Sequence, residues 1–375
     1  MTEQDSLQAS KPSIYKSSAT ETVAYDFTRL DKSVRRQLKS LTALDNWHAP
    51  LSIGLDYVGI AIAVLACTQV SWWFYPLALI YIGSTQRGFV NILHESTHKV
   101  LAKNKWWNLA LGTIFSGYMV FHLYNPYRAS HIGFHHRYLG DPAKDPDYSF
   151  HREMGIYDHS TSDRAFFFRN ILFALIGLRS YSYLKYVIED RILFRSEDVN
   201  VSMPVSMRTE RIVLALQWVL IVAVCAIFGW LHILLLLWFV PLLTVAIAIG
   251  WLTELAEHYP LPESEKHQLL MTRNRHGWAL ERFLFGRHND NYHLVHHLHM
   301  GIPFWNMKRA HTILLDDPAY RVWDGLWAGI LTRKSNENGR ETLLSYASRY
   351  REHCRTGGAP EGSSFAEAAA LTSRL

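Results

Sequence analysis

Two long apolar stretches interrupt an otherwise polar chain and determine its expected architecture. No Lys or Arg occurs between Lys39 and Arg87, and the stretch from Ile212 to Trp251 also lacks both. A membrane crossing needs about 20 apolar residues at 1.5 Å of rise per residue. Each stretch is therefore long enough for two helices. The pattern predicts crossings near residues 52–70, 72–92, 211–229 and 232–252, paired into two hairpins by short turns.

The polar segments outside these stretches predict the rest of the organisation. Residues 1–50 lack the features of a signal peptide and form a cytosolic N-terminal segment. Residues 51–320 form the membrane domain, and residues 321–375 form a C-terminal segment whose Ala-, Ser-, Gly- and Glu-rich tail is expected to be mobile. Two interrupted apolar stretches, 106–124 and 166–187, predict helices lying on or dipping into the membrane face. A fifth and sixth crossing are the alternative.

The distribution of charge predicts the orientation. All 38 Lys and Arg residues lie outside the two predicted hairpin turns. Because basic residues concentrate on the cytoplasmic side of membrane proteins, both termini and the loops 93–210 and 253–375 are expected in the cytoplasm. The formal charge of +5 then indicates proximity to an anionic leaflet rather than nucleic-acid binding. Three cysteines are too few for a disulfide framework or a thiolate metal site.

Histidine is unusually frequent, with 20 residues in 375, and it gathers in three short motifs. The motifs span His94–His98, His131–His136 and His293–His297, and each contains a pair spaced i, i+4. On a helix this spacing places both imidazoles on one face, about 6 Å apart. Neutral imidazole is a common ligand for iron, zinc and copper. A single such motif is weak support for a metal site, because helix packing and surface histidines produce the same spacing.

The positions of the motifs relative to the predicted crossings indicate a shared metal site. His258 lies just beyond the predicted fourth crossing, and with it nine histidines fall within a few turns of a crossing on one predicted side. They are His94, His98, His131, His135, His136, His258, His293, His296 and His297. Two metal ions with four or five nitrogen ligands each would use this number. An all-imidazole set of that size suits iron better than zinc. Redox iron beside a membrane predicts oxygen chemistry on a hydrophobic substrate.

The ordered motifs HxxxH, HxxxHH and HxxHH, with the two hydrophobic hairpins, resemble the membrane fatty acid desaturase superfamily over roughly residues 50–320. Residues 135–147 and 291–305 resemble its bacterial members in particular. The resemblance implies an all-α integral membrane fold, with four transmembrane helices in two hairpins and a cytosolic helical cap. It also implies a multi-pass protein of the bacterial inner membrane with a cytoplasmic active site.

The resemblance further implies that the nine histidines hold a non-haem di-iron centre, with O2 as co-substrate. His258 matches an additional histidine that follows the last crossing in family members, and Asn291 matches an asparagine near the metals. The second motif is HxxxHH where HxxHH is usual, which leaves the relative roles of His131 and His135 open.

The implied partners are a fatty acyl substrate, membrane lipid and a separate electron donor, but no nucleic acid. No HPGG haem-binding motif occurs in the chain. The donor is therefore expected to be a ferredoxin, a rubredoxin or a cytochrome b5 type protein with its reductase.

Acidic residues near the motifs are candidates for orienting the imidazoles through their second nitrogen. The candidates, with Asn291, are Glu95, Glu254, Glu257, Asp145, Asp147 and Asp290. Glu254 stands i, i+4 from His258 and is expected to accept its free N–H. Pro142 and Pro146 predict a loop around Asp145 and Asp147. A solvated cap or loop charge is the alternative for each acid.

The expected reaction is introduction of a double bond into an acyl chain, since the centre would remove hydrogen from an unactivated C–H bond. Decarboxylation to a terminal alkene and hydroxylation are alternatives on the same scaffold, because the product depends on how the chain is placed. A histidine-rich membrane metal carrier is the alternative from another class. It would need ligands inside the crossings. The crossings are almost empty of them, and Asp56 and His232 lie at the ends.

Overall fold

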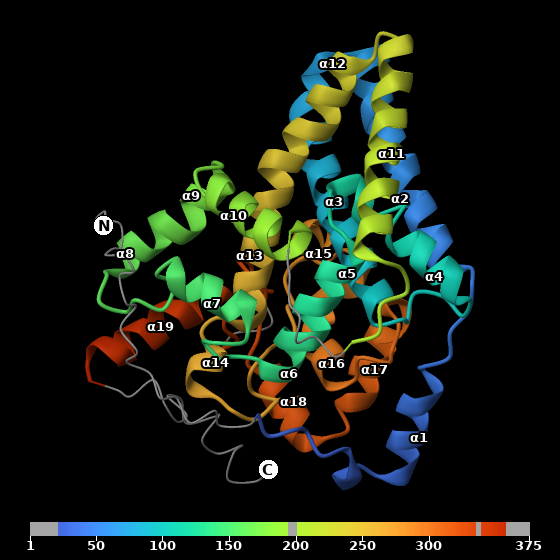
Figure 1. Cartoon of the computed structure of the whole chain (residues 1–375). Coiled ribbons are helices and arrows are strands. Elements are labelled where there is room, and N and C mark those ends of the chain that lie inside the picture. Colours follow the sequence, from blue (N-terminus) through green and yellow to red (C-terminus); the bar gives the residue numbers. More distant parts are fainter. Residues whose placement is uncertain (1–21, 194–200, 335–338, 358–375) are drawn as a thin grey trace, which may run out of the picture.

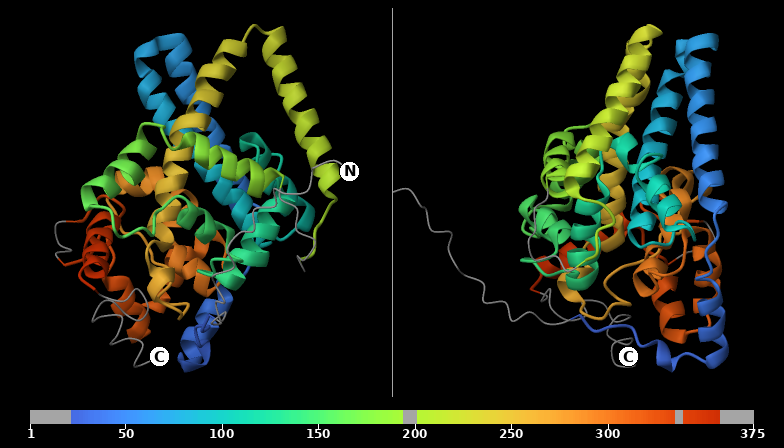
Figure 2. Two further views of the ribbon diagram at one scale, coloured as in Figure 1. Left: turned by 60° about the vertical axis from the view of Figure 1, so that its left-hand side comes forward. Right: turned by 45° about the vertical axis from the view of Figure 1, so that its right-hand side comes forward.

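Two long helical hairpins and a cap of shorter helices make up the computed structural model, which describes residues 22–193, 201–334 and 339–357. Every regular element in these three ranges is a helix. Figures 1 and 2 show both hairpins rising from the same side of the cap. The all-α prediction is therefore confirmed. The tail that was predicted to be mobile lies, from residue 358 onward, outside the described residues.

The first hairpin pairs two helices through a turn rich in aromatic residues. Its elements are α2 (His48–Leu65), η2 (Ala66–Val70), η3 (Trp72–Phe74) and α3 (Tyr75–Thr97). The second hairpin pairs α11 (Met207–Ile227) with one helical path made of α12 (Leu231–Leu234), η8 (Leu235–Phe239), η9 (Leu242–Ala246) and α13 (Ile247–His258). Gly229 makes the turn between them with a φ of 71°, a conformation that costs glycine little.

Three helices in the described ranges are long and apolar enough to cross a membrane. They span His48–Val70, Met207–Ile227 and Leu231–Ser264, with mean hydropathies of 1.9, 2.1 and 2.6. These three correspond to the predicted first, third and fourth crossings.

The predicted second crossing corresponds to α3, which differs from the other three helices in composition. Its second half carries buried polar residues that bind neighbouring backbone. The Ser84 hydroxyl donates to Leu284 O at 2.9 Å, and the Gln86 amide donates to Trp238 O at 2.8 Å. One half of α3 therefore resembles a membrane helix, while the other half is a buried polar helix that leads to the first histidine motif.

The two interrupted apolar stretches form different structures. Residues 106–124 break into α4 (Lys105–Gly112) and η4 (Gly117–Val120), which are too short to cross a membrane. The segments Asp163–Leu175 and Ser180–Ile192 are together apolar enough for a span but bend by 76°. Gly177, with a φ of 80°, lies at the bend. A broken span and a re-entrant loop are the two arrangements that fit this geometry.

The cap surrounds the inner ends of the hairpins. Its helices are η1 (Phe27–Arg29), α1 (Lys32–Ser40), α5 (Tyr124–Arg128), η5 (Ala129–His135), α6 (His136–Tyr138), α7 (Pro146–Glu153), α8 (Asp163–Phe167), η6 (Phe168–Leu172), α9 (Phe173–Leu175), α10 (Ser180–Tyr186), η7 (Val187–Ile192), α14 (Leu261–Ser264), α15 (Ala279–Phe285), η10 (Arg287–Tyr292), α16 (His293–Leu298), η11 (Phe304–Asn306), α17 (Met307–Leu314), α18 (Pro318–Gly325) and α19 (Leu343–Arg355).

One apolar core joins both ends of the described chain to the third histidine motif. Tyr25 and Leu38 from the N-terminal segment share it with Leu294 of α16, Trp323 of α18 and Tyr350 of α19. The predicted divisions at residues 50 and 320 fall inside α2 and α18, so neither coincides with a break between helices. The N-terminal and C-terminal segments therefore pack against the helix that carries the third histidine motif.

Candidate metal centre

Nine histidines from distant parts of the chain converge in two adjacent clusters. The five-histidine cluster consists of His94, His98, His131, His136 and His296, whose ligand nitrogens all lie within 4.8 Å of one another. The four-histidine cluster consists of His135, His258, His293 and His297. The rings of His136 and His297, with centroids 4.4 Å apart, bring the two clusters together. The structure thus gathers all nine histidines that the sequence singled out.

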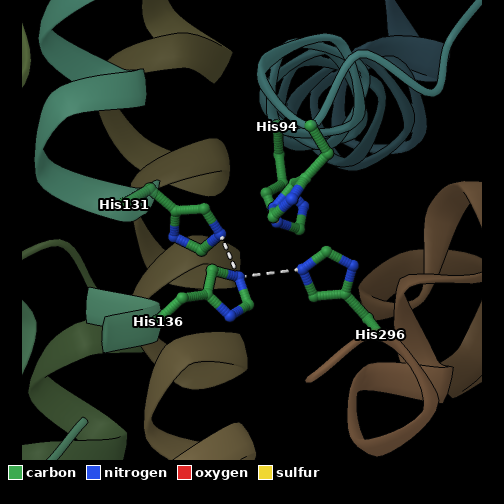
Figure 3. A group of neighbouring side chains, drawn as sticks. His94, His131, His136 and His296 are labelled. Carbon is green, nitrogen blue, oxygen red and sulfur yellow. Dashed lines mark hydrogen bonds between the residues drawn. The ribbon is translucent and has the colours of Figure 1, made fainter. Parts of the chain in front are cut away.

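The Nε2 atoms of each cluster face one another at short range. In the five-histidine cluster, the Nε2 atom of His136 lies 2.9 Å from that of His131 and 3.1 Å from that of His296. Figure 3 shows His94, His131, His136 and His296 pointing to a common centre from three segments of the chain. In the four-histidine cluster, His293 lies 3.1 Å from His258 and 3.0 Å from His297, again between Nε2 atoms.

A π-helical turn decides which histidines of the second motif share a cluster. In η5 the His136 N–H donates to His131 O, five residues back. A π turn holds more residues than an α turn, so residues i and i+5 share a face. His131 and His136 therefore meet in one cluster, while His135 belongs to the other. The sequence left the relative roles of His131 and His135 open. The π turn places them in different clusters, although their ligand nitrogens still lie within 4.8 Å of each other.

The other two motifs follow α-helical spacing. His94 and His98, at the end of α3, both belong to the five-histidine cluster, with their Nε2 atoms 3.2 Å apart. His293 and His297 share the four-histidine cluster at i, i+4 on α16, whereas His296 turns to the other cluster. A single short helix thus contributes to both clusters.

Burial favours the neutral, metal-binding form of three of these imidazoles. Desolvation lowers the pKa values of His131, His136 and His297 well below the ordinary range, and neighbouring imidazoles lower them further. A neutral imidazole keeps one nitrogen lone pair free. Two ligand nitrogens about 2.1 Å from one ion and at right angles are about 3 Å apart. The observed spacings fit nitrogens that share an ion.

Two carboxylates hold His135 from behind. Asp145 Oδ1 lies 3.1 Å from its Nδ1 atom, and Asp147 Oδ2 lies 3.4 Å away. Burial opposes a charge on His135, but the two carboxylates outweigh it and raise the pKa. Asp145 also accepts from the N–H groups of Asp147 and Tyr148 as the N-cap of α7. The predicted loop therefore ends at Asp145, because this aspartate starts a helix.

Glu257 and Glu95 approach the third motif from opposite sides. Glu257 Oε1 lies 3.5 Å from His293 Nδ1. Glu95 Oε1 lies 3.9 Å from His296 Nδ1, too far for a hydrogen bond, and its other oxygen accepts from the Phe304 N–H at 3.0 Å. Both carboxylates thus face ring nitrogens that point away from the clusters, and Glu257 lies nearer to its histidine than Glu95 does.

Two of the expected supports have other partners. His258 Nδ1 faces Met271 O at 3.2 Å, and Glu254 accepts from the Tyr183 hydroxyl at 2.8 Å. The expected Glu254–His258 contact is wrong, because the carbonyl of Met271 occupies that side of the imidazole. The Asn291 amide donates to Arg275 O at 3.4 Å and supports the loop before α16.

Two arginines that sequence reasoning missed hold the acids in place. Arg275 Nη2 lies 3.0 Å from Glu257 Oε1 and 2.7 Å from Asp290 Oδ2. Arg191 Nη2 lies 2.6 Å from Asp147 Oδ1, which also accepts from the Tyr186 hydroxyl. No local spacing links these partners. The only available signal was general: buried acids require nearby cations.

The charges around the clusters favour bound cations. A cavity of about 50 Å³ lies between histidines of both clusters. The charged groups that line it are Arg87, Asp145, Asp147, Arg191, Glu254, Glu257 and Asp290. Carboxyl groups outnumber guanidinium groups, and a buried excess of negative charge is costly without further cations. The donor set and the charge both fit metal ions.

Buried imidazole clusters beside apolar helices are typical of a membrane-associated metalloprotein. Residues 70–324 match the sequence profile of the fatty acid desaturase family, and the chain belongs to that family. It is therefore an oxidoreductase of the desaturase type.

Similar proteins agree with this assignment. The dihydrorhizobitoxine desaturase of Bradyrhizobium elkanii is 41% identical over 311 residues, which cover 82% of this chain and 87% of the relative. The sn-1 oleoyl-lipid 12-desaturase of Anabaena variabilis is 25% identical, over 71% of this chain and 73% of the relative. A chloroplastic omega-6 fatty acid desaturase of Brassica napus is 23% identical, over 73% of this chain and 61% of the relative.

Proposed function

We propose that this chain is a membrane di-iron desaturase that introduces a double bond into an acyl chain. The observation that carries the proposal is the convergence of nine imidazoles into two adjacent clusters, one of five and one of four. Nitrogen ligands in these numbers suit two iron ions. Zinc in proteins is usually bound by four ligands. The five-histidine cluster would hold one iron and the four-histidine cluster the other.

Iron bound at both clusters would supply the oxidising power, using O2 and two electrons to remove hydrogen from an unactivated C–H bond. The protein's own residues would have narrower tasks. The histidines hold the metal pair, and Asp145, Glu257 and the Met271 carbonyl fix the ring orientation of three of them. Arg191 and Arg275 keep the neighbouring carboxylates in place.

A large apolar cavity would receive the acyl chain. It has a volume of about 400 Å³ and lies between α3, the α10–η7 helices that follow the bend, and the η9–α13 part of the second hairpin. Its apolar lining includes Val90, Val187, Leu242 and Ile247. Arg87 lines this cavity and also the small polar cavity between the clusters. The acyl chain would therefore approach the metals past the Arg87 side chain.

The nature of the relatives favours desaturation over the other outcomes. The three relatives described above are all named as desaturases, from a bacterium, a cyanobacterium and a plant. Decarboxylation to a terminal alkene and hydroxylation have no comparable support. The names cover two substrates, dihydrorhizobitoxine and acyl lipids, so both belong in a substrate panel.

The distribution of basic residues supports an orientation with the clusters and both termini in the cytoplasm of a bacterial cell. Electrons would then come from a separate cytoplasmic donor of the ferredoxin, rubredoxin or cytochrome b5 type, passed on by a reductase.

Mass spectrometry of lipids and volatile products from bacteria that express the chain tests the proposal, with His297→Ala as the inactive control. New unsaturated acyl chains that are absent from the control are the expected result. Alkenes one carbon shorter than the cellular fatty acids, or hydroxylated chains, would overturn desaturation as the reaction. Cells supplied with dihydrorhizobitoxine test the other substrate.

Val187→Phe tests the acyl-chain cavity separately. Val187 is 7% exposed and lines the cavity, so a larger side chain there shortens the available space. We expect lower conversion of long acyl chains relative to short ones, with unchanged iron content. An unchanged chain-length profile would show that the substrate lies elsewhere.

A further inference from the structure

A second group of metal-capable side chains lies in the cap and shares no residue with the two histidine clusters. His276, His311 and Asp324 offer ligand atoms that all lie within 4.8 Å of one another. We propose that these three residues form an additional site for a single divalent transition metal such as zinc. The proposal goes beyond the desaturase reaction and does not depend on it.

The three residues come from separate segments. His276 precedes α15, His311 belongs to α17 and Asp324 belongs to α18. The Nε2 atom of His276 lies 2.9 Å from Asp324 Oδ1, while His311 Nδ1 lies 3.9 Å from the same oxygen. The two imidazole rings have centroids 5.3 Å apart. Two histidines and one carboxylate are a common set of three zinc ligands, with water as the fourth.

The surroundings set the tautomer of His311, whose Nδ1 lone pair accepts a hydrogen bond that a bound metal would replace. Asn274 donates to both the Tyr320 hydroxyl oxygen at 2.7 Å and Asp324 Oδ1 at 2.6 Å. The Tyr320 hydroxyl can therefore donate its own hydrogen to His311 Nδ1, 2.9 Å away. Burial lowers the pKa of His311 to about 4, despite the opposing effect of Asp324, so the ring is neutral near pH 7. A neutral ring that accepts at Nδ1 is in the ligand tautomer.

The three side chains are mostly buried, but the two imidazoles remain accessible to an ion from solvent. The side chains of His276 and His311 are 11% and 14% exposed, whereas that of Asp324 is 5% exposed. An ion would reach the buried carboxylate past two partly exposed imidazoles. The polar partners of Asp324 would act as its supports, because Asn274 and the carboxylate already share a hydrogen bond.

A metal here would stiffen the support of the third histidine motif. Asn274 Oδ1 accepts from the Leu294 N–H in α16 at 3.1 Å, while its amide group binds Asp324. Tyr292, next to His293, packs on His311 with ring centroids 5.1 Å apart. The ion would tie α17, α18 and the segment before α15 to the same helix that carries His293, His296 and His297.

Zinc titration of the full-length, iron-loaded protein in detergent tests the site. Metal analysis after dialysis should find one zinc per chain with the iron content and turnover unchanged. Asp324→Asn and His311→Gln should each lose this zinc and the rise in unfolding temperature that it causes. The exposed hairpin histidine variant His232→Gln is the matched control and should keep both.

Several outcomes would overturn the proposal. Zinc uptake at the expense of iron would assign the zinc to the nine-histidine centre. Equal zinc content in the parent, Asp324→Asn and His311→Gln would remove these residues as ligands. X-ray absorption at the zinc edge should show two imidazoles with oxygen, and a different first coordination sphere would exclude the site. Turnover of each variant shows that it is folded, so a loss of zinc in an active variant is informative.

Discussion

The five-histidine and four-histidine clusters hold their imidazoles in different ways. In the described ranges, His296 is the only member of the larger cluster with a carboxylate oxygen within 4 Å of a ring nitrogen, and that Nδ1 atom has no hydrogen-bond partner. The four-histidine cluster has fewer rings, but three of them face an oxygen atom of a neighbouring residue. His135 faces Asp145, His258 faces the Met271 carbonyl and His293 faces Glu257.

This difference suggests two ways to stabilise a metal ion with neutral ligands. The larger cluster relies on number, since an extra imidazole compensates for rings whose orientation is less fixed. The smaller cluster relies on orientation, since each supported ring is held in place and made more basic by its partner. The five-histidine cluster should therefore tolerate the loss of one ligand better than the four-histidine cluster.

Removal of one ligand from each cluster should produce the largest effect. His258→Ala leaves three imidazoles in the smaller cluster, and His98→Ala leaves four in the larger one. We expect both variants to lose turnover, with a much larger loss of bound iron in His258→Ala. Iron analysis of the purified proteins checks this. Equal iron loss in both variants would contradict the proposed difference, and the exposed His232→Ala serves as the control.

Neutralising one supporting acid at each cluster should produce an intermediate effect. Asp145→Asn removes the charge beside His135 but keeps a residue that caps α7 well. We expect turnover or iron affinity to fall about 10- to 100-fold, in line with other metal sites that lose such a support. Glu95→Gln should cost less, because 3.9 Å separates its oxygen from His296. Steady-state turnover and iron affinity measure both, and a larger loss in Glu95→Gln would reverse the ranking.

A buried acid outside both clusters should produce the smallest effect and act on the fold alone. Desolvation raises the pKa of Glu265 to about 7. The unfolded chain then loses this proton at lower pH than the folded chain, so stability falls as pH rises from about 4.5 to 7. Glu265→Gln should recover up to about 3 kcal/mol at pH 8 and much less at pH 5.

Unfolding temperatures of Glu265→Gln at both pH values check that expectation, with the exposed Glu153→Gln as the matched control. Iron content should stay unchanged at both pH values. Any change in iron content would mean that Glu265 acts on the clusters. The difference between the two clusters would then depend on pH.

The sequence predicts the site more completely than it predicts the arrangement within the site. Periodicity and joint placement find all nine histidines, because ligands near helix ends need fixed spacing. They do not predict that His131 and His135 belong to different clusters, because a π turn leaves no mark in the spacing of one motif. They also fail at Glu254, since the Met271 carbonyl that replaces it is a backbone group with no sequence signature.

Long-range contacts set the other limit. Arg275 reaches Glu257 and Asp290, and Arg191 reaches Asp147 across 44 positions of the chain. Such pairs arise only after folding brings distant segments together. The fold itself was easier to predict from the sequence, because long stretches without Lys or Arg predict long apolar helices. α3 is the exception, because its polar half is buried against other helices of the protein.

The helical path from Leu231 to His258 leads directly from the apolar hairpin to the four-histidine cluster. At 1.5 Å per residue it measures about 40 Å, longer than the roughly 30 Å hydrocarbon layer of a bilayer. Such a helix tilts to match the thickness of its surroundings, and its inner end carries a candidate metal ligand. A change in bilayer thickness that tilts this helical path would therefore also move His258.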